Sequence, residues 1–498
     1  MTDLVLSPTT AMLAAGTLLL LSVLANRLSD NFGVPALIMF LLVGMLAGSD
    51  GIGGIHFDNP AAANFVGVIA LAYILFSGGL DTEWRSVRPV LWRATILSTF
   101  GVTITAALVG VFVWKVLGFT LKEGLLLGAI VSSTDAAAVF SIMRARGVGL
   151  RGRLKPLLEL ESGSNDPMAA FLTIAAIGWL MSPEMSWQEL LVSLGIRMTI
   201  GLLVGVAIGF MASFVLDRLR LEYDGLYPVL STSIVLLSYS LSDVIQGNGF
   251  LAVYASGIVL GNREFFHKQF LTRFHDGLAW LMQVILFVVL GLLVFPSRLP
   301  EVAGSALLVS AFLMFVARPV AVYLGLWGSS FTMAEKTLVA WTGLRGAVPI
   351  VLATFPFTAG YEHSESMFNI VFFIVLTSVI LQGRTLMWMA KWLNVDAPLL
   401  ARPAHPTETE TPVVVKGDVC EIVVAPDSQL VGKMVLELGL PKSVLIVMIR
   451  REDKFIIPKG RTSLKPFDTV SLIADRDGLK QARNLMLSPE QNKDSADK

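Results

Sequence analysis

Long hydrophobic runs separated by short polar breaks occupy the chain from residue 10 to residue 393. A helix needs about 20 mostly apolar residues to cross a bilayer. The pattern therefore predicts an all-α polytopic membrane protein with thirteen spans. Their approximate ranges are 10–28, 34–48, 61–80, 94–117, 121–142, 157–181, 189–216, 226–244, 248–262, 276–295, 302–327, 335–356 and 366–393. The second and ninth runs are short, and Pro35 and Gly257 are expected to bend or break them.

The polar breaks alternate in charge along the chain. Breaks that follow odd-numbered runs hold fifteen Lys and Arg residues, whereas those that follow even-numbered runs hold only Lys115, Lys122 and Arg298. Basic loops stay on the cytoplasmic side of a membrane. The pattern predicts an N-terminus outside and a C-terminal part in the cytoplasm. A missed or invented span would disturb this alternation, so the charges favour the count of thirteen.

Composition agrees with a chain that lies mostly in lipid. Of its 498 residues 54% are hydrophobic and 15% are charged, and the mean hydropathy is +0.70, whereas soluble domains carry about 25% charged residues. Basic and acidic residues balance at 38 each, which gives no net field to attract nucleic acid. One cysteine, Cys420, and five histidines exclude a disulfide framework and a His-rich metal centre. We expect no cofactor and no cleaved signal peptide.

The composition changes after residue 394. Residues 395–412 hold several Pro, Thr and Glu residues and are typical of a linker. Residues 413–485 predict a small soluble α+β domain, and residues 486–498 a polar tail. The expected strands are 418–424, 443–449, 453–458 and 469–474, and the expected helices are 431–438 and 478–486. A core of about 70 residues is marginal alone, which favours dimerisation.

Ionisable side chains deep in a span are costly and tend to mark ion pathways. In this chain they gather in four of the predicted spans. They are Asp135 in the fifth, Glu159, Glu161 and Asp166 in the sixth, Arg318 in the eleventh and Arg345 in the twelfth. The candidate chemistry of the chain therefore lies where these spans meet.

The sixth span presents oxygen ligands on neighbouring faces. Ser162 and Asp166 are four residues apart and share one helical face, and Glu161 and Asn165 share the next. Pro167 has no amide hydrogen, so a backbone carbonyl one turn earlier loses its helical partner. Carboxylate, hydroxyl and carbonyl oxygens of this kind suit an alkali cation. The alternative is that Asp166 only forms a hydrogen bond to another helix.

Two spans are interrupted near their middle. A Ser-Ser-Thr-Asp run at 132–135 interrupts the fifth, and Gly343, Gly346 and Pro349 interrupt the twelfth. If the seventh span is a linker, spans 1–6 and 8–13 form a 6+1+6 inverted repeat in which the broken, crossing helices occupy matching positions. Paired discontinuous helices of this kind indicate a transport site.

The broken helices leave half-helix ends that carry partial charges. Asp135 would offset the positive N-terminal ends. Arg345 would offset the negative C-terminal ends or form an ion pair with Glu161. For Arg345 we favour a structural ion pair over direct contact with the transported ion.

Three motifs make residues 1–394 resemble the NhaP-type branch of the monovalent cation/proton antiporters. They are STDAAAV at 133–139, ESGSNDP at 161–167 and GLRGAVPI at 343–350. The resemblance implies a homodimer whose core domain moves against a dimerisation domain. It also implies that Asp166 carries cation and proton alternately, with Ser162, Thr134 and Asn165 completing the site. Glu161 would pair with Arg345. Some members place an acid on the third span, but residues 76–80 (FSGGL) offer none.

The C-terminal segment resembles the TrkA-C domain of regulators of potassium conductance. The matching stretches are QLVGK at 429–433, IIPKG at 456–460 and LKPFDTV at 464–470. The resemblance implies a dimerising domain that often binds a small ligand, for which a nucleotide is a reasonable guess. A dimerisation module without a ligand stays open. The appended domain makes the whole chain resemble the potassium/proton antiporters of the branch.

These observations predict a secondary active antiporter that exchanges cytoplasmic potassium or sodium for protons by alternating access. Deprotonated Asp166 would bind the cation and protonated Asp166 would not. Asn165 stands where electrogenic relatives have a second Asp, so one-for-one electroneutral exchange is expected. The spacing does not distinguish potassium from sodium, because their chemistry and charge are the same.

Two other classes fit less well. A potassium channel gated by the TrkA-C domain is the main alternative, but the chain has no TVGYG filter. An intramembrane hydrolase using Ser162 or Ser164 would need a positioned base, and all five histidines fall in predicted loops or the tail, so we expect no enzyme. His267 and His275 are candidate cytoplasmic pH sensors. Arg197 in the seventh span receives no predicted role.

Overall fold

The structure is a computed structural model of the chain. It describes residues 8–32, 36–181, 186–219, 221–263, 265, 267–398, 418–424, 428, 430–440, 444–451 and 454–474. The chain separates into two compact units, Met1–Leu400 and Ala401–Lys498. Each unit is described by itself.

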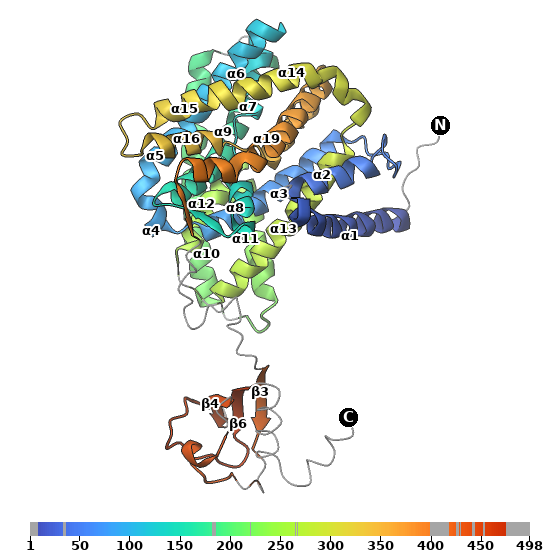
Figure 1. Cartoon of the computed structure of the whole chain (residues 1–498). Helices are drawn as coiled ribbons and strands as arrows, with labels where there is room; N and C mark the ends of the chain where they lie inside the picture. The colour runs from blue at the N-terminus through green and yellow to red at the C-terminus, as the bar shows by residue number, and fades with distance from the viewer. Residues whose placement is uncertain are drawn as a thin grey trace. The chain divides into compact units, whose positions relative to one another are not determined.

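The first unit is a bundle of α-helices (Figure 1). Its helices in chain order are α1 Pro8–Phe32, α2 Ala36–Ala47, α3 Pro60–Asp81, α4 Trp84–Val87, α5 Leu91–Ile96, α6 Val102–Leu117, α7 Leu121–Ile130, α8 Ala136–Ala145, α9 Leu154–Met181, α10 Trp187–Arg218, α11 Leu226–Val244, α12 Gly249–Gly261, α13 Lys268–Leu292, α14 Leu299–Phe312, α15 Arg318–Gly325, α16 Met333–Trp341, α17 Ala347–Leu352, α18 Phe355–Thr358 and α19 Ser364–Trp392. Short 3₁₀ and π turns join some of them: η1 Arg88–Val90, η2 Leu97–Gly101, η3 Pro296–Arg298 and η4 Leu313–Ala317.

Seven helical stretches of the described residues are long and apolar enough to cross a membrane. They are Pro8–Ala25, Pro60–Asp81, Trp84–Leu117, Gln188–Arg218, Lys268–Leu292, Pro296–Gly325 and Ser364–Trp392. The short second and ninth runs form the short apolar helices α2 and α12. The multi-pass helical prediction is therefore confirmed. The count of thirteen spans and the inverted repeat stay predictions.

Both predicted interruptions are confirmed. The helix α7 ends at Ile130 and α8 begins at Ala136, with irregular backbone between them. In the same way α16 ends at Trp341 and α17 begins at Ala347. The polar run 132–135 and the glycines of 343–346 fill the gaps, because these residue types favour caps and turns over helix interiors.

Glycines let neighbouring helices approach closely, as two of the crossings illustrate. A Cβ at Gly79 in α3 would lie 2.6 Å from the Tyr254 carbonyl oxygen in α12. A Cβ at Gly44 in α2 would lie 2.3 Å from the Val288 carbonyl oxygen in α13. Small residues at such crossings allow the backbone contact that stabilises helix pairs in lipid. The close packing fixes α12 beside α3, which places Tyr254 next to the candidate site.

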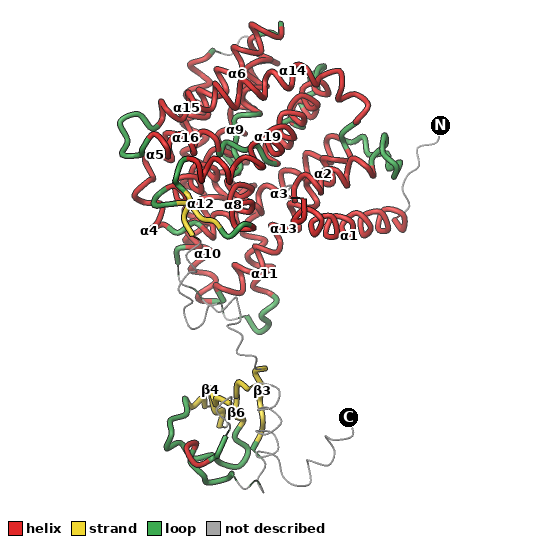
Figure 2. Tube along the Cα trace, in the orientation of Figure 1, coloured by secondary structure: helices red, strands yellow, loops and turns green. Residues whose placement is uncertain are grey.

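A two-stranded antiparallel sheet joins the loop between α8 and α9 to the segment that follows α19. Strand β1 (Val148–Leu150) pairs with β2 (Asp396–Pro398), seen as yellow segments in Figure 2. The Arg151 amide N–H donates to the Val395 carbonyl at 3.0 Å, and Arg151 Nε donates to the Asp396 carbonyl at 2.9 Å. The expected linker therefore differs at its start, where residues 396–398 gain backbone partners in the α8–α9 loop. Its remainder from residue 399 lies outside the described residues.

The second unit contains a four-stranded antiparallel sheet in the order β3-β6-β4-β5. The strands are β3 Asp418–Val423, β4 Val444–Arg451, β5 Lys454–Ile456 and β6 Thr469–Ala474, close to the predicted ranges. Apolar side chains from the sheet and its loops form a separate small core around Val424, Ile449 and Leu464. The predicted helix 478–486 and the tail lie outside the described residues.

The predicted helix over 431–438 is wrong. The segment forms a turn and a short 3₁₀ helix, η5 (Val435–Glu437). The Val435 amide N–H donates to the Thr462 carbonyl at 2.9 Å, and the Leu436 N–H donates to the Gly460 carbonyl at 3.0 Å. These bonds to a distant loop replace the bonds that an α-helix needs, and Gly432, with φ of +84°, bends the chain out of helical geometry.

An ion pair between the buried Asp468 and the partly exposed Arg451 ties the sheet to its last loop. Arg451 Nε and Nη2 donate to Asp468 Oδ1 and Oδ2 at 2.8 and 2.7 Å, and the Lys465 amide N–H donates to the same carboxylate at 2.8 Å. Burial raises the pKa of Asp468, but the hydrogen bonds from Arg451 and Lys465 outweigh it, so the pKa lies below its ordinary value.

We expect this pair to make the small domain sensitive to acid. The pKa of Asp468 is lower in the folded state than its unfolded value of about 3.9, so the ionised carboxylate stabilises the domain at pH values above about 3.9. That stability is lost as the pH falls through the folded-state pKa. Hydrogen exchange of β4 and β6, corrected for intrinsic rates, should be constant from pH 7 to about 5 and accelerate below about 4. Asp468→Asn should already exchange faster at pH 7. Equal protection in both proteins at pH 7 would contradict the role of the pair.

Candidate functional site

The two interrupted helices hold each other across their irregular stretches. The Asp135 amide N–H donates to the Leu344 carbonyl at 2.8 Å. Arg345 Nη1 donates to the Ser132 carbonyl at 2.7 Å and also to the Ser133 carbonyl. The guanidinium thus lies at the carbonyl-rich C-terminal end of α7, where a cation is favoured. The crossing forms one continuous polar structure in the bundle.

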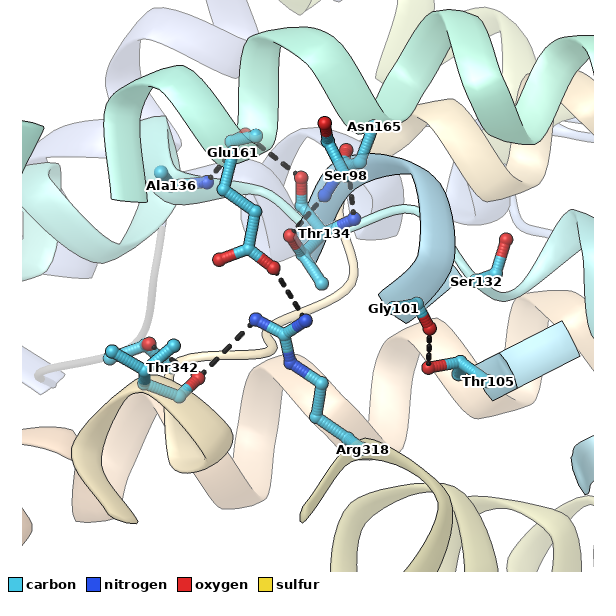
Figure 3. A network of polar contacts seen from close by, with 12 residues as sticks. Ser98, Gly101, Thr105, Ser132, Thr134, Ala136, Glu161, Asn165, Arg318 and Thr342 are labelled. Atoms are coloured by element: carbon cyan, nitrogen blue, oxygen red, sulfur yellow. Dashed lines mark hydrogen bonds and ion pairs between the residues drawn. The ribbon is translucent and has the colours of Figure 1, made fainter. Parts of the chain in front are cut away.

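The helix α9 is fixed to this crossing by two polar side chains (Figure 3). Ser162 Oγ donates to the Thr134 carbonyl at 2.9 Å and accepts from the Ala136 N–H at 3.0 Å. Asn165 Nδ2 donates to Thr134 Oγ1 at 2.6 Å, and the Thr134 N–H donates to Asn165 Oδ1 at 3.4 Å. The broken backbone at 134–136 therefore has side-chain partners in place of its missing helical ones, as buried backbone groups require.

Asp166 lies on the same helix and faces the crossing. Its carboxylate accepts a hydrogen bond from the Ser133 hydroxyl. It lines a cavity of about 210 Å³ together with Ser133, Thr134, Asp135 and Ser162. The structure therefore brings the four predicted binding residues and Asp135 together. The Asp135 side chain caps α8, because its Oδ1 accepts from the Ala138 N–H at 2.9 Å.

The cavity also reaches charged residues farther from the crossing. Asp81, Arg144 and Glu159 line it. Glu159 Oε1 lies 3.3 Å from Lys155 Nζ, and the Glu159 side chain is 31% exposed. Polar and charged groups therefore line a path from Asp166 toward a solvated end of α9. The Asp166 carboxylate is therefore not enclosed by apolar side chains alone.

The structure corrects the expected pair between Glu161 and Arg345. Glu161 Oε1 instead accepts from Arg318 Nη1 at 2.5 Å, and both side chains are buried (Figure 3). Arg345 is occupied by the carbonyls of Ser132 and Ser133. The physical reason is position, because Arg318 begins α15 directly after the π turn Leu313–Ala317 and extends toward α9. The sequence pattern places Arg318 within a span but predicts no partner for it.

This buried charge cluster keeps several unused hydrogen-bonding atoms. Among the described residues, Glu161 Oε2, Arg318 Nε and Arg345 Nε and Nη2 are buried without a hydrogen-bond partner. The Glu161 carboxylate pairs with Arg318, while the Arg345 guanidinium binds backbone carbonyls. Buried polar atoms of this kind are usually satisfied by ordered water.

The structure also moves His275 from its predicted loop and gives Arg197 a partner. His275 does not lie in a loop, because α13 begins at Lys268 and includes it. The ring is buried, and its Nε2 lies 2.9 Å from Ser231 Oγ. Arg197, which had no predicted role, donates from Nη2 to Gln246 Oε1 at 2.8 Å and so joins α10 to the α11–α12 loop.

Comparison with known proteins identifies the first unit. Residues 16–392 match the family described as "Sodium/hydrogen exchanger, transmembrane". The chain belongs to this family. Residues 419–487 match the TrkA-C domain, so both resemblances predicted from the motifs are confirmed. Membership makes the chain a multi-pass antiporter, and it gives no indication of an enzyme.

Several known exchangers are similar over most of the chain. The K(+)/H(+) antiporter NhaP of Alkalimonas amylolytica is 38% identical over 93% of this chain and 80% of its own length. The K(+)/H(+) antiporter NhaP2 of Shewanella baltica is 37% identical over 95% of this chain and 82% of its own. The solved structure of the sodium proton antiporter MjNhaP1 from Methanocaldococcus jannaschii superposes with a TM-score of 0.65 and 25% identity, covering 75% of this chain and 99% of that one.

Proposed function

We propose that the chain exchanges potassium for protons by alternating access, with Asp166 as the shared binding group. The observation that carries this proposal is the position of Asp166 in a polar cavity at the crossing of two broken helices. Discontinuous helices at such a crossing are typical of transport sites. Two relatives over most of the chain are named K(+)/H(+) antiporters, which favours potassium over sodium as the cation.

Asp166 is the carboxylate at the crossing that is free to exchange its partner. Asp135 is held by the Ala138 N–H at the start of α8, and Glu161 is held by Arg318. Among the described residues, Asp166 accepts only the hydroxyl hydrogen bond from Ser133. A single carboxylate carries one negative charge, so it neutralises either one monovalent cation or one proton. The proposal therefore predicts one-for-one, electroneutral exchange.

The surrounding groups supply oxygen ligands and balance the helix ends. The hydroxyls of Ser133 and Ser162 and the Thr134 carbonyl lie beside Asp166 in the cavity wall. Asn165 holds Thr134 in place and adds no charge. Asp135 and Arg345 offset the partial charges at the ends of α8 and α7. Among the described residues at the crossing, the charge available to the transported cation is then that of Asp166.

The rest of the proposal concerns assembly and control. We infer a homodimer in a bacterial inner membrane, with the N-terminus outside and the TrkA-C domain in the cytoplasm. The distribution of basic residues supports this orientation. The TrkA-C domain would regulate exchange, and a nucleotide is the class of ligand to test first.

Proton flux in proteoliposomes tests the function directly. With potassium, sodium and lithium supplied in turn, a potassium gradient should drive the fastest alkalinisation or acidification of the lumen. An imposed membrane potential should not change the rate. A chain ending at residue 398, which keeps β2 but lacks the TrkA-C domain, should still exchange. Potential-driven potassium uptake without proton movement would instead support the channel alternative.

Gly346 offers a test of the crossing geometry. A Cβ at this position would lie 2.0 Å from Asp135 Oδ2, so Gly346→Ala must displace the side chain that caps α8. We expect proton flux to fall at least about tenfold, since small displacements in a preorganised site are costly. The matched control is Gly277→Ala, where an added Cβ meets nothing within 4 Å. Equal flux in the two variants would show that this contact does not matter.

A further inference from the structure

A second cavity lies beside the first and has a different character. It opens between α5, η2 and α9 on one side and α10 and α12 on the other, with a volume of about 710 Å³. That size is within the range of small-molecule sites, about 300–1,000 Å³. We call it the lateral cavity. Its apolar lining includes Met168, Leu202, Phe210, Leu251, Ile258 and Val259.

The three threonine hydroxyls that line the lateral cavity already form hydrogen bonds. Thr95 Oγ1 donates to the Leu91 carbonyl at 2.9 Å, and Thr99 Oγ1 donates to the Thr95 carbonyl at 2.6 Å. Thr199 Oγ1 donates to the carbonyl of Gly195 at 2.7 Å. A polar ligand in this part would lose its hydration and gain few hydrogen bonds in return. The lining therefore favours an apolar chain.

One end of the cavity carries a cation. Arg263 follows the end of α12, and its guanidinium lies over the Phe210 ring with 4.7 Å between the guanidinium carbon and the ring centroid. Among the ion pairs of the described residues, none includes Arg263. Trp84 lines the same cavity and is 43% exposed. Trp and Arg at the end of a membrane helix are typical of the lipid headgroup level.

The cavity also faces outward from the helix bundle. Leu202 and Phe210 on α10 are 48% and 46% exposed although they are apolar. The π turn η2 (Leu97–Gly101) contributes Ser98 and Thr99 to the wall, and π turns inside helices are frequent at functional sites. An occupant can therefore enter sideways from the bilayer.

We propose that the lateral cavity binds one anionic phospholipid of the membrane. An acyl chain would occupy the apolar part between α9 and α10, and the phosphate would lie at Arg263. Opposite charge selects an anionic lipid over a zwitterionic one, because no carboxylate of the described residues pairs with that guanidinium.

The bound lipid would lie one helix away from the transport site. Tyr254 lines both cavities. Its ring packs against Gly163 in α9, where an added Cβ would lie 2.3 Å from the Tyr254 ring. An acyl chain in the lateral cavity would therefore contact the same α9 and Tyr254 that bound the cavity of Asp166.

Native mass spectrometry of the detergent-solubilised full chain tests this site. The probes are phosphatidylglycerol and phosphatidylcholine with identical acyl chains, titrated separately. We expect one phosphatidylglycerol to bind in preference to phosphatidylcholine. Arg263→Ala should weaken phosphatidylglycerol binding about tenfold, as expected from the loss of one charge-assisted hydrogen bond. Leu202→Trp should fill the cavity and reduce binding of both lipids.

The matched control is Arg218→Ala. Arg218 lies over the Phe214 ring on the same helix, α10, but does not line the lateral cavity. The Arg218→Ala variant should bind phosphatidylglycerol as tightly as the unaltered protein does. Equal weakening by Arg218→Ala and Arg263→Ala would reduce the effect to general surface attraction and overturn the proposal. Lipid binding that is unchanged in Leu202→Trp would overturn the proposal as well. So would a protein that is dimeric without bound lipid and becomes monomeric in Leu202→Trp, because the cavity would then be a contact between two copies of the chain.

Discussion

Replacing Asp166 with Asn should reduce cation-dependent proton flux in proteoliposomes by about 100-fold or more. The side chain keeps its size and can still contact Ser133, but it can neither hold a negative charge nor release a proton. Two unit charges 4 Å apart attract each other by about 4 kcal/mol at an effective dielectric of 20, which corresponds to about 1,000-fold in affinity. Flux should be measured with potassium gradients at several pH values.

Glu159→Gln is the matched control for Asp166→Asn. Glu159 lines the same cavity, but its carboxylate is paired with Lys155 and partly exposed. We expect less than about a tenfold change in flux, because exposed pairs contribute little, about 0–1 kcal/mol. If both variants lose flux equally, the cavity needs general negative charge and not Asp166 in particular. Full activity of Asp166→Asn would remove the basis of the proposed function.

Replacing Arg318 with Met should destabilise the membrane unit by about 3–5 kcal/mol, because it leaves Glu161 buried and unpaired. The Arg318 and Glu161 side chains are only 4% and 1% exposed, and their atoms lie 2.5 Å apart. Equilibrium unfolding in a denaturing detergent would measure the change in free energy. The double variant Glu161→Leu/Arg318→Met should recover most of the loss, because replacing a buried pair by apolar side chains is often neutral or stabilising.

Arg197→Met provides the comparison for this second prediction. Arg197 forms a hydrogen bond to Gln246 in an exposed position, so its removal should cost less than about 1 kcal/mol. If Arg318→Met is no more destabilising than Arg197→Met, the Glu161–Arg318 pair does not stabilise the fold.

The broken helices and the residues at their crossing could be predicted from the sequence because their signals are local. Ser, Thr and Asp at 132–135 and the glycines of 343–346 disfavour helix over a few consecutive residues. The spacing of Ser162, Asn165 and Asp166 follows from helical periodicity. The structure brings these residues to one place.

Contacts between distant segments could not be predicted in the same way. The partner of Glu161 is 157 positions away and depends on how α15 is rotated toward α9. The 431–438 segment has helical spacing, but its N–H groups bond to carbonyls near residues 460–462. The position of His275 could not be predicted because polar and charged residues interrupt the apolar ones over 268–275, so a search for long apolar runs starts this span only after His275.

The β1–β2 pairing determines which parts of the membrane unit feel a mechanical load on the chain beyond residue 398. Three residues of β2 are registered against Val148–Leu150, and Arg151 adds two hydrogen bonds to the backbone at 395 and 396. Tension along this strand would load those bonds in shear, so part of the force passes to the connection between α8 and α9. A pull on the chain beyond residue 398 thus acts on the segment that joins the broken helix α8 to α9, the helix of Asp166, and not on the end of α19 alone.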